Sequence, residues 1–166
     1  PTRCAVGRQT AEPLPSVAVA IIGRPNVGKS SLLNALLREE RVIVHEAPGT
    51  TRDAVETLLR IGSESVRLVD TAGLKPRPKV KDPVEFFAMS RTFHAIDRCD
   101  VALVVLDATM GVSREDRRIV ARVCDAGRGL VLLVNKWDLV RGGDPRRLPD
   151  VIRKALPFAA WAPVLA

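Results

Sequence analysis

The sequence predicts an α/β domain in which helices sandwich a mainly parallel β-sheet. Continuous apolar runs such as Val17–Ile22 and Val101–Leu106 are typical of strands that are buried on both faces. Amphipathic helical patterns alternate with these runs, and such alternation indicates parallel strands joined by right-handed crossovers. The 166 residues are 46% apolar, which is enough chain for one domain with a real core and too little for two.

In the first half of the chain, turn residues separate the predicted elements. Residues 1–16 have no usable period and are predicted to be a linker or tail, so that the domain spans residues 17–166. A glycine-rich turn follows the first strand and leads into a helix at Ser30–Arg38, where four leucines share one face. Glu39–Asp53 shows neither a helical nor a strand pattern and is predicted to be a loop. Two runs around a Gly-Ser pair predict an antiparallel hairpin: Val55–Ile61 and Ser65–Val69.

The second half continues the alternation of helix and strand. After an irregular stretch, the predicted elements are helix Glu85–Asp97, strand Val101–Leu106, helix Ser113–Ala126, strand Leu130–Val134 and helix Pro145–Leu156. Ser113 is predicted to cap its helix, because its hydroxyl and the acidic residues after it suit the free amide groups there. The last residues, Ala162–Ala166, look like the opening of an edge strand. We therefore expect a chain that is cut before the last strand and helix of the domain are complete.

Composition excludes several classes of function. No apolar run approaches the roughly 20 residues that a membrane helix needs, so no membrane partner is expected. Three scattered cysteines indicate reduced thiols in a cytoplasmic protein rather than a disulfide framework. With 4% aromatic residues and no Tyr, stacking on RNA bases is not expected as the main binding mode. The net charge of +7 favours an acidic partner such as RNA, with an ordinary solvated surface as the alternative.

The segment after the first strand has the spacing Gly-x-x-x-x-Gly-Lys-Ser, which predicts a phosphate-binding P-loop. Its two glycines let the backbone turn successive N–H groups toward phosphate oxygens. Lys29 is predicted to reach the β- and γ-phosphates, and the helix N-terminus adds partial positive charge. The Ser30 hydroxyl is predicted to bind Mg²⁺. The predicted nucleotide contacts in this segment are Gly23, Arg24, Pro25, Asn26, Val27, Gly28, Lys29, Ser30 and Ser31.

The tetrapeptide Asn135-Lys136-Trp137-Asp138 follows an apolar strand and predicts guanine binding. Guanine presents two neighbouring donors, N1–H and the exocyclic amine, and the Asp138 carboxylate can accept both. Adenine has an acceptor at its own N1, which a carboxylate repels. Asn135 is predicted to brace the P-loop and the base, Lys136 to lie along the guanine plane, and Trp137 to pack as a hydrophobic cover. Together with the P-loop, this motif predicts a guanine-nucleotide switch.

A third motif follows the hairpin and predicts the magnesium and γ-phosphate contacts. Asp70 is predicted to hold Mg²⁺ through a water, and the Gly73 N–H to meet the γ-phosphate, whose loss then releases the loop. Asp107 is the competing magnesium candidate, but no Thr-Ala-Gly follows it, and a structural or capping role explains it better. The predicted contacts of this motif are Asp70, Thr71, Ala72, Gly73 and Leu74.

Two further positions bear on the switch and on hydrolysis. In the predicted loop, the Thr51 hydroxyl is expected to complete the Mg²⁺ shell, with Thr50 as the second choice and a plain exposed loop as the alternative. Leu74 occupies the place where many switch GTPases have a glutamine that orients the attacking water. Because leucine has no polar group, hydrolysis must depend on another side chain, an ion or a partner.

Taken together, these segments resemble the translation-factor-like P-loop GTPases of the TrmE-Era-EngA group. The narrower resemblance is to the second GTP-binding domain of the EngA/Der double-domain GTPases, which act in assembly of the large ribosomal subunit. It rests on Arg24-Pro25-Asn26-Val27, on Pro48-Gly49-Thr50-Thr51-Arg52-Asp53 and on Asn135–Val140, and it covers about residues 17–165.

The resemblance implies a K⁺-stimulated GTPase with GTP or GDP, Mg²⁺ and K⁺ as cofactors. Asn26 would hold K⁺ near the β- and γ-phosphates, and the catalytic residues would be Lys29, Asn26, Thr51 and Gly73. It also implies ribosomal RNA and protein of the large subunit as partners, another G domain before this one and a KH-like domain after it. Family members continue into a Ser-Ala motif that contacts the guanine. This chain ends before that motif, so we expect weak nucleotide binding by the chain alone.

Two other functions remain open at the level of the sequence. The first is a nucleotide-responsive docking domain with negligible turnover, which Leu74 also allows. The second is an ATP-using P-loop enzyme, which the carboxylate of Asp138 argues against.

Overall fold

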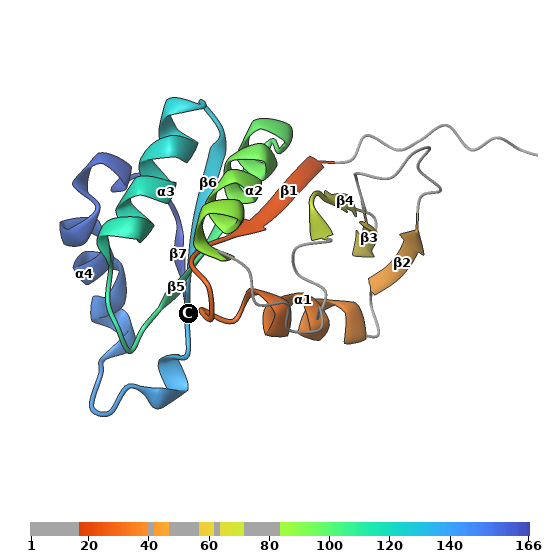
Figure 1. The fold of residues 1–166 in the computed structure, drawn as a ribbon. Coiled ribbons are helices and arrows are strands. Elements are labelled where there is room, and N and C mark those ends of the chain that lie inside the picture. The colour runs from red at the N-terminus through yellow and green to blue at the C-terminus, as the bar shows by residue number, and fades with distance from the viewer. Residues whose placement is uncertain (1–16, 40–41, 47–56, 62–63, 72–83) are drawn as a thin grey trace, which may run out of the picture.

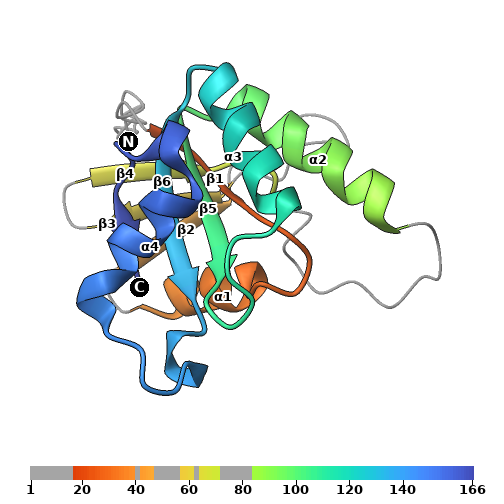
Figure 2. The same ribbon diagram turned by 90° about the vertical axis from the view of Figure 1, so that its left-hand side faces the viewer.

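The described residues form a seven-stranded sheet with helices on both faces (Figures 1 and 2). The computed structural model describes residues 17–39, 42–46, 57–61, 64–71 and 84–166. The strands are β1 (Val17–Ile22), β2 (Val42–Glu46), β3 (Thr57–Ile61), β4 (Glu64–Leu68), β5 (Val101–Asp107), β6 (Gly129–Asn135) and β7 (Val164–Leu165). The α-helices are α1 (Lys29–Arg38), α2 (Val84–Arg98), α3 (Arg114–Asp125) and α4 (Leu148–Ala155). Three short 3₁₀ helices complete the described part: Trp137–Leu139, Pro145–Arg147 and Pro157–Ala159.

The strand order is β2-β3-β4-β1-β5-β6-β7, and pairing is parallel from β4 through to β7. Only the β2–β3 and β3–β4 pairs of the described sheet are antiparallel. This confirms the predicted α/β class with a mainly parallel sheet. The carboxyl ends of parallel strands meet at one edge, and the chain leaves β1, β5 and β6 there (Figure 2).

Two apolar clusters fill the two faces of the sheet. One lies between the sheet and helices α2, α3 and α4, and its fully buried members include Ile96, Val104 and Ile119. The other lies between the sheet and α1 and includes Leu33, Leu59 and Val105. Burial alternates strictly along β6, as the predicted strand pattern requires. Helix α1 alone covers its face of the sheet in the described structure, so Leu103 of β5 and Leu133 of β6 on that face remain half buried, whereas Val105 of β5 is fully buried.

Strand β2 corrects one prediction from the sequence. Residues 42–46 lie inside Glu39–Asp53, which was predicted to be a loop, but they pair with β3 along its whole length. The strand is at the sheet edge, where one neighbour is enough and a short segment shows no long period. Of the rest of the predicted loop, Glu39 is described, and residues 40–41 and 47–53 lie outside the described residues.

The other predicted elements are present with small shifts of their boundaries. Helix α1 begins one residue earlier than predicted, and the predicted C-terminal helix starts with a 3₁₀ turn before α4. Val164–Leu165 pairs with β6 as the expected edge strand. Ser113 caps α3 as predicted, in a capping box in which Asp116 bonds back to the Ser113 backbone. No helix in the described part of the chain is long and apolar enough to span a bilayer.

A matched pair of valine substitutions tests the position of the core. Val123→Ala removes two methyl groups from a fully buried position on α3 and is expected to lower the free energy of unfolding by about 2 kcal/mol. Val151→Ala, on α4, makes the same change at a side chain that is 58% exposed and should cost under about 0.5 kcal/mol. Chemical denaturation of both variants measures the difference. Equal losses would contradict this placement of the core.

Candidate functional site

The P-loop connects β1 to α1 through a backbone that L-residues rarely adopt. Gly23, Asn26 and Gly28 have positive φ angles of 145°, 65° and 101°. A Cβ on Gly23 would lie 2.5 Å from the backbone oxygen of Val105, so glycine is required there by close approach as well as by φ. Asparagine is the non-glycine residue that most readily tolerates the left-handed conformation, which accounts for Asn26.

The start of α1 is arranged to receive an anion. Its N-cap residue is Gly28, which offers no side-chain cap to the first amide groups, and its first turn has no acidic residue. Those N–H groups therefore keep their partial positive charge for a ligand. Lys29 donates from Nζ to the backbone oxygens of Gly23, at 2.8 Å, and Arg24, at 2.6 Å. Burial lowers the pKa of Lys29, and the carboxylate of Glu115 opposes that shift.

The base motif lies against the P-loop at the end of β6. Asn135 donates from Nδ2 to the backbone oxygen of Val27 at 2.8 Å, which is the brace that the sequence predicted. The next residue, Lys136, has a φ of 63°, and a 3₁₀ turn then leaves Asp138 exposed. Trp137 is half buried against the larger core cluster, so that it packs as a cover.

Lys136 has a partner that the sequence did not indicate. Its ammonium group bonds to Oδ2 of Asp107 at 2.5 Å, and Asp107 lies beside Asn135 in the β5–β6 register. Thr109 donates to the other carboxylate oxygen from its N–H at 2.9 Å and from its hydroxyl at 2.6 Å. These hydrogen bonds lower the pKa of Asp107 to about 2, and the bond from Lys136 has the largest effect. Asp107 thus has the structural role that the sequence favoured for it over magnesium binding.

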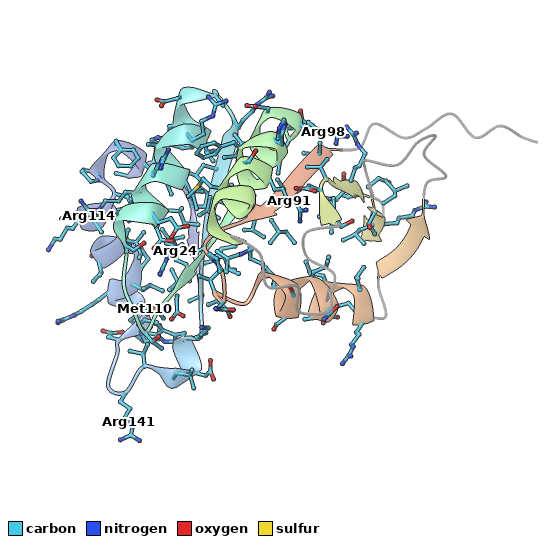
Figure 3. All side chains as sticks on the ribbon, in the orientation of Figure 1. Arg24, Arg91, Arg98, Met110, Arg114 and Arg141 are labelled. Carbon is cyan, nitrogen blue, oxygen red and sulfur yellow. The ribbon has the colours of Figure 1, made fainter. Side chains whose placement is uncertain are left out.

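Arg24 also has a partner that sequence reasoning missed. Its Nε bonds to Oδ1 of Asp116 at 2.9 Å, and the two side chains are 12% and 0% exposed. The guanidinium therefore faces the start of α3 (Figure 3), although Arg24 was predicted to contact the nucleotide. Its Nη2 is buried and has no hydrogen-bond partner among the described residues. The only sequence feature that could have indicated this partner was Asp116 itself. It is an acidic residue in the first turn of a helix, and helix capping alone was enough to explain it.

Asp70 and Thr71 follow β4 at the same edge of the sheet. The backbone N–H of Val69 bonds to the oxygen of Val19 at 3.0 Å, which fixes this segment against β1. Asp70 has a φ of 57°, and Thr71 is buried with its hydroxyl 3.3 Å from that of Thr57. The remaining predicted contacts of the third motif and the switch threonines lie outside the described residues: Thr50, Thr51, Ala72, Gly73 and Leu74.

The described donors fit Mg²⁺ bound together with phosphates. Ser30, which is exposed, and Asp70 offer a hydroxyl and a carboxylate, and the ion prefers such oxygen ligands. Among the described residues, no three His, Cys, Asp or Glu side chains cluster as a metal cage. In proteins, Mg²⁺ is usually held by one or two side-chain oxygens together with substrate phosphates and water.

Comparison with protein families and curated proteins gives consistent matches. The model of a family described as 50S ribosome-binding GTPase matches residues 18–136. The GTPase Der of Synechococcus sp. (strain JA-3-3Ab) is 47% identical over 163 residues, which are 96% of this chain and 36% of that protein. The GTPase Der of Desulforudis audaxviator (strain MP104C) is 47% identical over 151 residues, 90% of this chain and 34% of that protein. The chain spans about a third of the length of these relatives.

Solved structures give the same fold. Era in complex with MgGDPNP and nucleotides 1506–1542 of 16S ribosomal RNA is 30% identical, with a TM-score of 0.64, and the match covers 90% of this chain and 50% of Era. Aquifex aeolicus Era bound to GDP and AlF4⁻ is 26% identical, with a TM-score of 0.63 and the same coverage. These matches confirm the predicted P-loop fold, and the Der matches confirm the resemblance drawn from the sequence.

Gly28 provides a test of the brace between the P-loop and the base motif. A Cβ there would overlap Nδ2 of Asn135, so Gly28→Ala should displace that amide from Val27 and weaken nucleotide binding at least about tenfold. Gly142→Ala is the matched control, because Gly142 also has a positive φ, 70°, but open space around its Cβ. Both variants carry about 1–2 kcal/mol of backbone strain. Equal nucleotide affinities in calorimetry would contradict the brace.

Proposed function

We propose that this chain, which belongs to the 50S ribosome-binding GTPase family, is a GTP-binding and GTP-hydrolysing switch domain that acts in large ribosomal subunit assembly. The observation that carries this proposal is the bond from Asn135 to Val27. It holds the base motif at a fixed separation from the P-loop, so that one ligand with a purine and a phosphate tail fits both.

Specificity for guanine follows from the chemistry of one carboxylate. Asp138 is exposed at the 3₁₀ turn after β6, where a purine held by the neighbouring residues would present its edge. The carboxylate accepts the two donors of guanine and repels the N1 acceptor of adenine. A bound guanine nucleotide would then have its base at the end of β6 and its phosphates at the end of β1.

Phosphate binding and hydrolysis would be shared between described residues and the two switch segments. Lys29 and the amides at the start of α1 would hold the phosphates, and Ser30 and Asp70 would hold Mg²⁺ together with Thr51. Mg²⁺ supplies neutralisation of the charge that develops on the transferred phosphoryl group. The magnesium nucleotide bound in the Era structure supports this assignment, because its P-loop fold is shared.

We infer further that hydrolysis is stimulated by K⁺. Asn26 is exposed in the P-loop at a left-handed φ of 65°, so its side-chain amide is accessible to a monovalent cation. Leu74 cannot orient water, so a second positive charge near the β- and γ-phosphates would supply stabilisation that other switch proteins obtain from glutamine or arginine.

For the whole protein, we propose that this chain is the second of two G domains. Residues 17–166 would form the G domain after a linker or tail at 1–16, and the full chain would carry another G domain and a KH-like domain. The threefold greater length of the Der relatives supports this organisation. The ribosomal RNA in the Era structure and the net charge of +7 support large-subunit RNA and protein as partners.

Calorimetry with GDP and ADP tests the guanine site. The chain is expected to bind GDP at least about 100-fold more tightly than ADP, and Asp138→Asn should remove most of that preference, because an amide both donates and accepts. Asp150→Asn, at an exposed carboxylate on α4, is the matched control and should bind as the parent does. Equal affinity of the parent for both diphosphates would refute the proposed function and favour an ATP-using enzyme.

GTP hydrolysis in K⁺ and in Na⁺ tests the ion. The rate is expected to be at least about tenfold higher in K⁺, and Asn26→Gly should abolish the difference while tolerating the positive φ. Asn34→Ala, at an exposed asparagine on α1, is the control and should keep the stimulation. Rates independent of the ion would contradict the role of Asn26, and no turnover in either salt would favour a docking domain.

A further inference from the structure

The connection between β5 and α3 holds two cationic side chains that belong to the proposed nucleotide site. An aspartate flanks this connection on each side, Asp107 as the last residue of β5 and Asp116 in the first turn of α3, and both carboxylates are buried. Each aspartate bonds one cation that was predicted to contact the nucleotide, Lys136 at one end and Arg24 at the other. The middle of the connection is exposed, with Met110 at its tip (Figure 3).

The Asp116 end of the connection leads to the phosphates. Asp116 bonds Ser113 through Oδ2, to the N–H at 2.9 Å and the hydroxyl at 2.8 Å, which leaves Oδ1 for Arg24. The backbone oxygen of Arg24 in turn accepts a bond from the Lys29 ammonium at 2.6 Å. Asp116 therefore fixes both the course of the P-loop backbone and the place from which Lys29 reaches a phosphate.

The Asp107 end leads to the base. Thr109 donates two hydrogen bonds to Oδ1 of Asp107, and Oδ2 of Asp107 accepts the bond from the Lys136 ammonium. The adjoining N–H of Ala108 bonds to the backbone oxygen of Asn135 at 2.9 Å. The β5–α3 connection thus fixes the backbone of Asn135 and the side chain of Lys136, which lies two residues before the carboxylate that would read guanine.

We propose that Asp107 and Asp116 are positioning residues for nucleotide binding, Asp107 through Lys136 for the guanosine part and Asp116 through Arg24 for the diphosphate part. The inference rests on the proposed function. The geometry separates the two roles, because the bonds of Asp116 end at the P-loop and those of Asp107 end at the base motif. Neither carboxylate would touch the ligand.

Competition against a fluorescent GDP, on the full chain, tests the two roles with three probes. Asp116→Asn is expected to weaken GDP and inorganic pyrophosphate at least about tenfold and guanosine less than about twofold. Asp107→Asn is expected to weaken GDP and guanosine to the same extent, about five- to tenfold, and pyrophosphate less than about twofold. Asp125→Asn, at an exposed carboxylate that ends α3, is the control and should bind all three probes as the parent does.

Milder variants repeat the test in case the aspartate variants do not fold. Arg24→Gln leaves the bonds that Ser113 donates to Asp116 in place and should show the Asp116 pattern. Thr109→Val removes one bond to Asp107 and should show the Asp107 pattern at about two- to fivefold. Thermal unfolding of each variant separates lost fold from lost positioning.

Three outcomes would overturn the inference while the proposed function stands. Variants that lose thermal stability yet bind every probe as the parent does would show that both pairs are structural only. Equal weakening of guanosine and pyrophosphate by either variant would refute the division of roles. The opposite assignment of the two probes would also refute it. A parent chain that binds GDP no better than ADP would instead refute the proposed function, and the inference with it.

Discussion

The hydrogen bond from Asn135 to the backbone oxygen of Val27 is the contact on which the arrangement of the site depends. It joins residues that are 108 positions apart and spans the end of β5, which lies between β1 and β6 in the sheet. Two close approaches make it possible: Gly28 leaves room for the Asn135 amide, and Gly23 lets the loop pass against Val105. The parallel sheet brings the strand ends to one edge, and this bond then sets the spacing between the phosphate and base sites.

Much of the fold was predictable from the sequence because burial on both faces leaves a strong pattern. Central strands such as β1, β5 and β6 are continuous apolar runs, and α3 is marked by its capping box and its amphipathic face. Strand β2 was missed because it is a short edge strand whose pairing with β3 is a long-range property. Local patterns report burial and turns, and they do not report which neighbour a short edge segment will find.

The candidate site also contains features that the sequence predicted and contacts that it did not. The spacing of glycines, lysine and serine in the P-loop predicts phosphate binding, because each residue type has a distinct role there. The positive φ angles agree with the glycine positions. The partners of Arg24 and Lys136 could not be found in this way. Asp116 is 92 residues from Arg24, and its buried carboxylate was already explained by the helix cap. When one side chain bonds both a near and a distant partner, the sequence pattern indicates only the near one.

Charge balance explains why these acidic residues lie behind the site. Lys29, Arg24, Lys136 and the N-terminus of α1 gather positive charge at one edge of the sheet, and without compensation their mutual repulsion would oppose the folded state. Compensation in front of the site would compete with a phosphate ligand. Asp107 and Asp116 instead offset the charge from the side of the protein core, where each is buried and fully hydrogen-bonded. The cations are thereby held in place before an anion arrives, so that ligand binding does not have to order them.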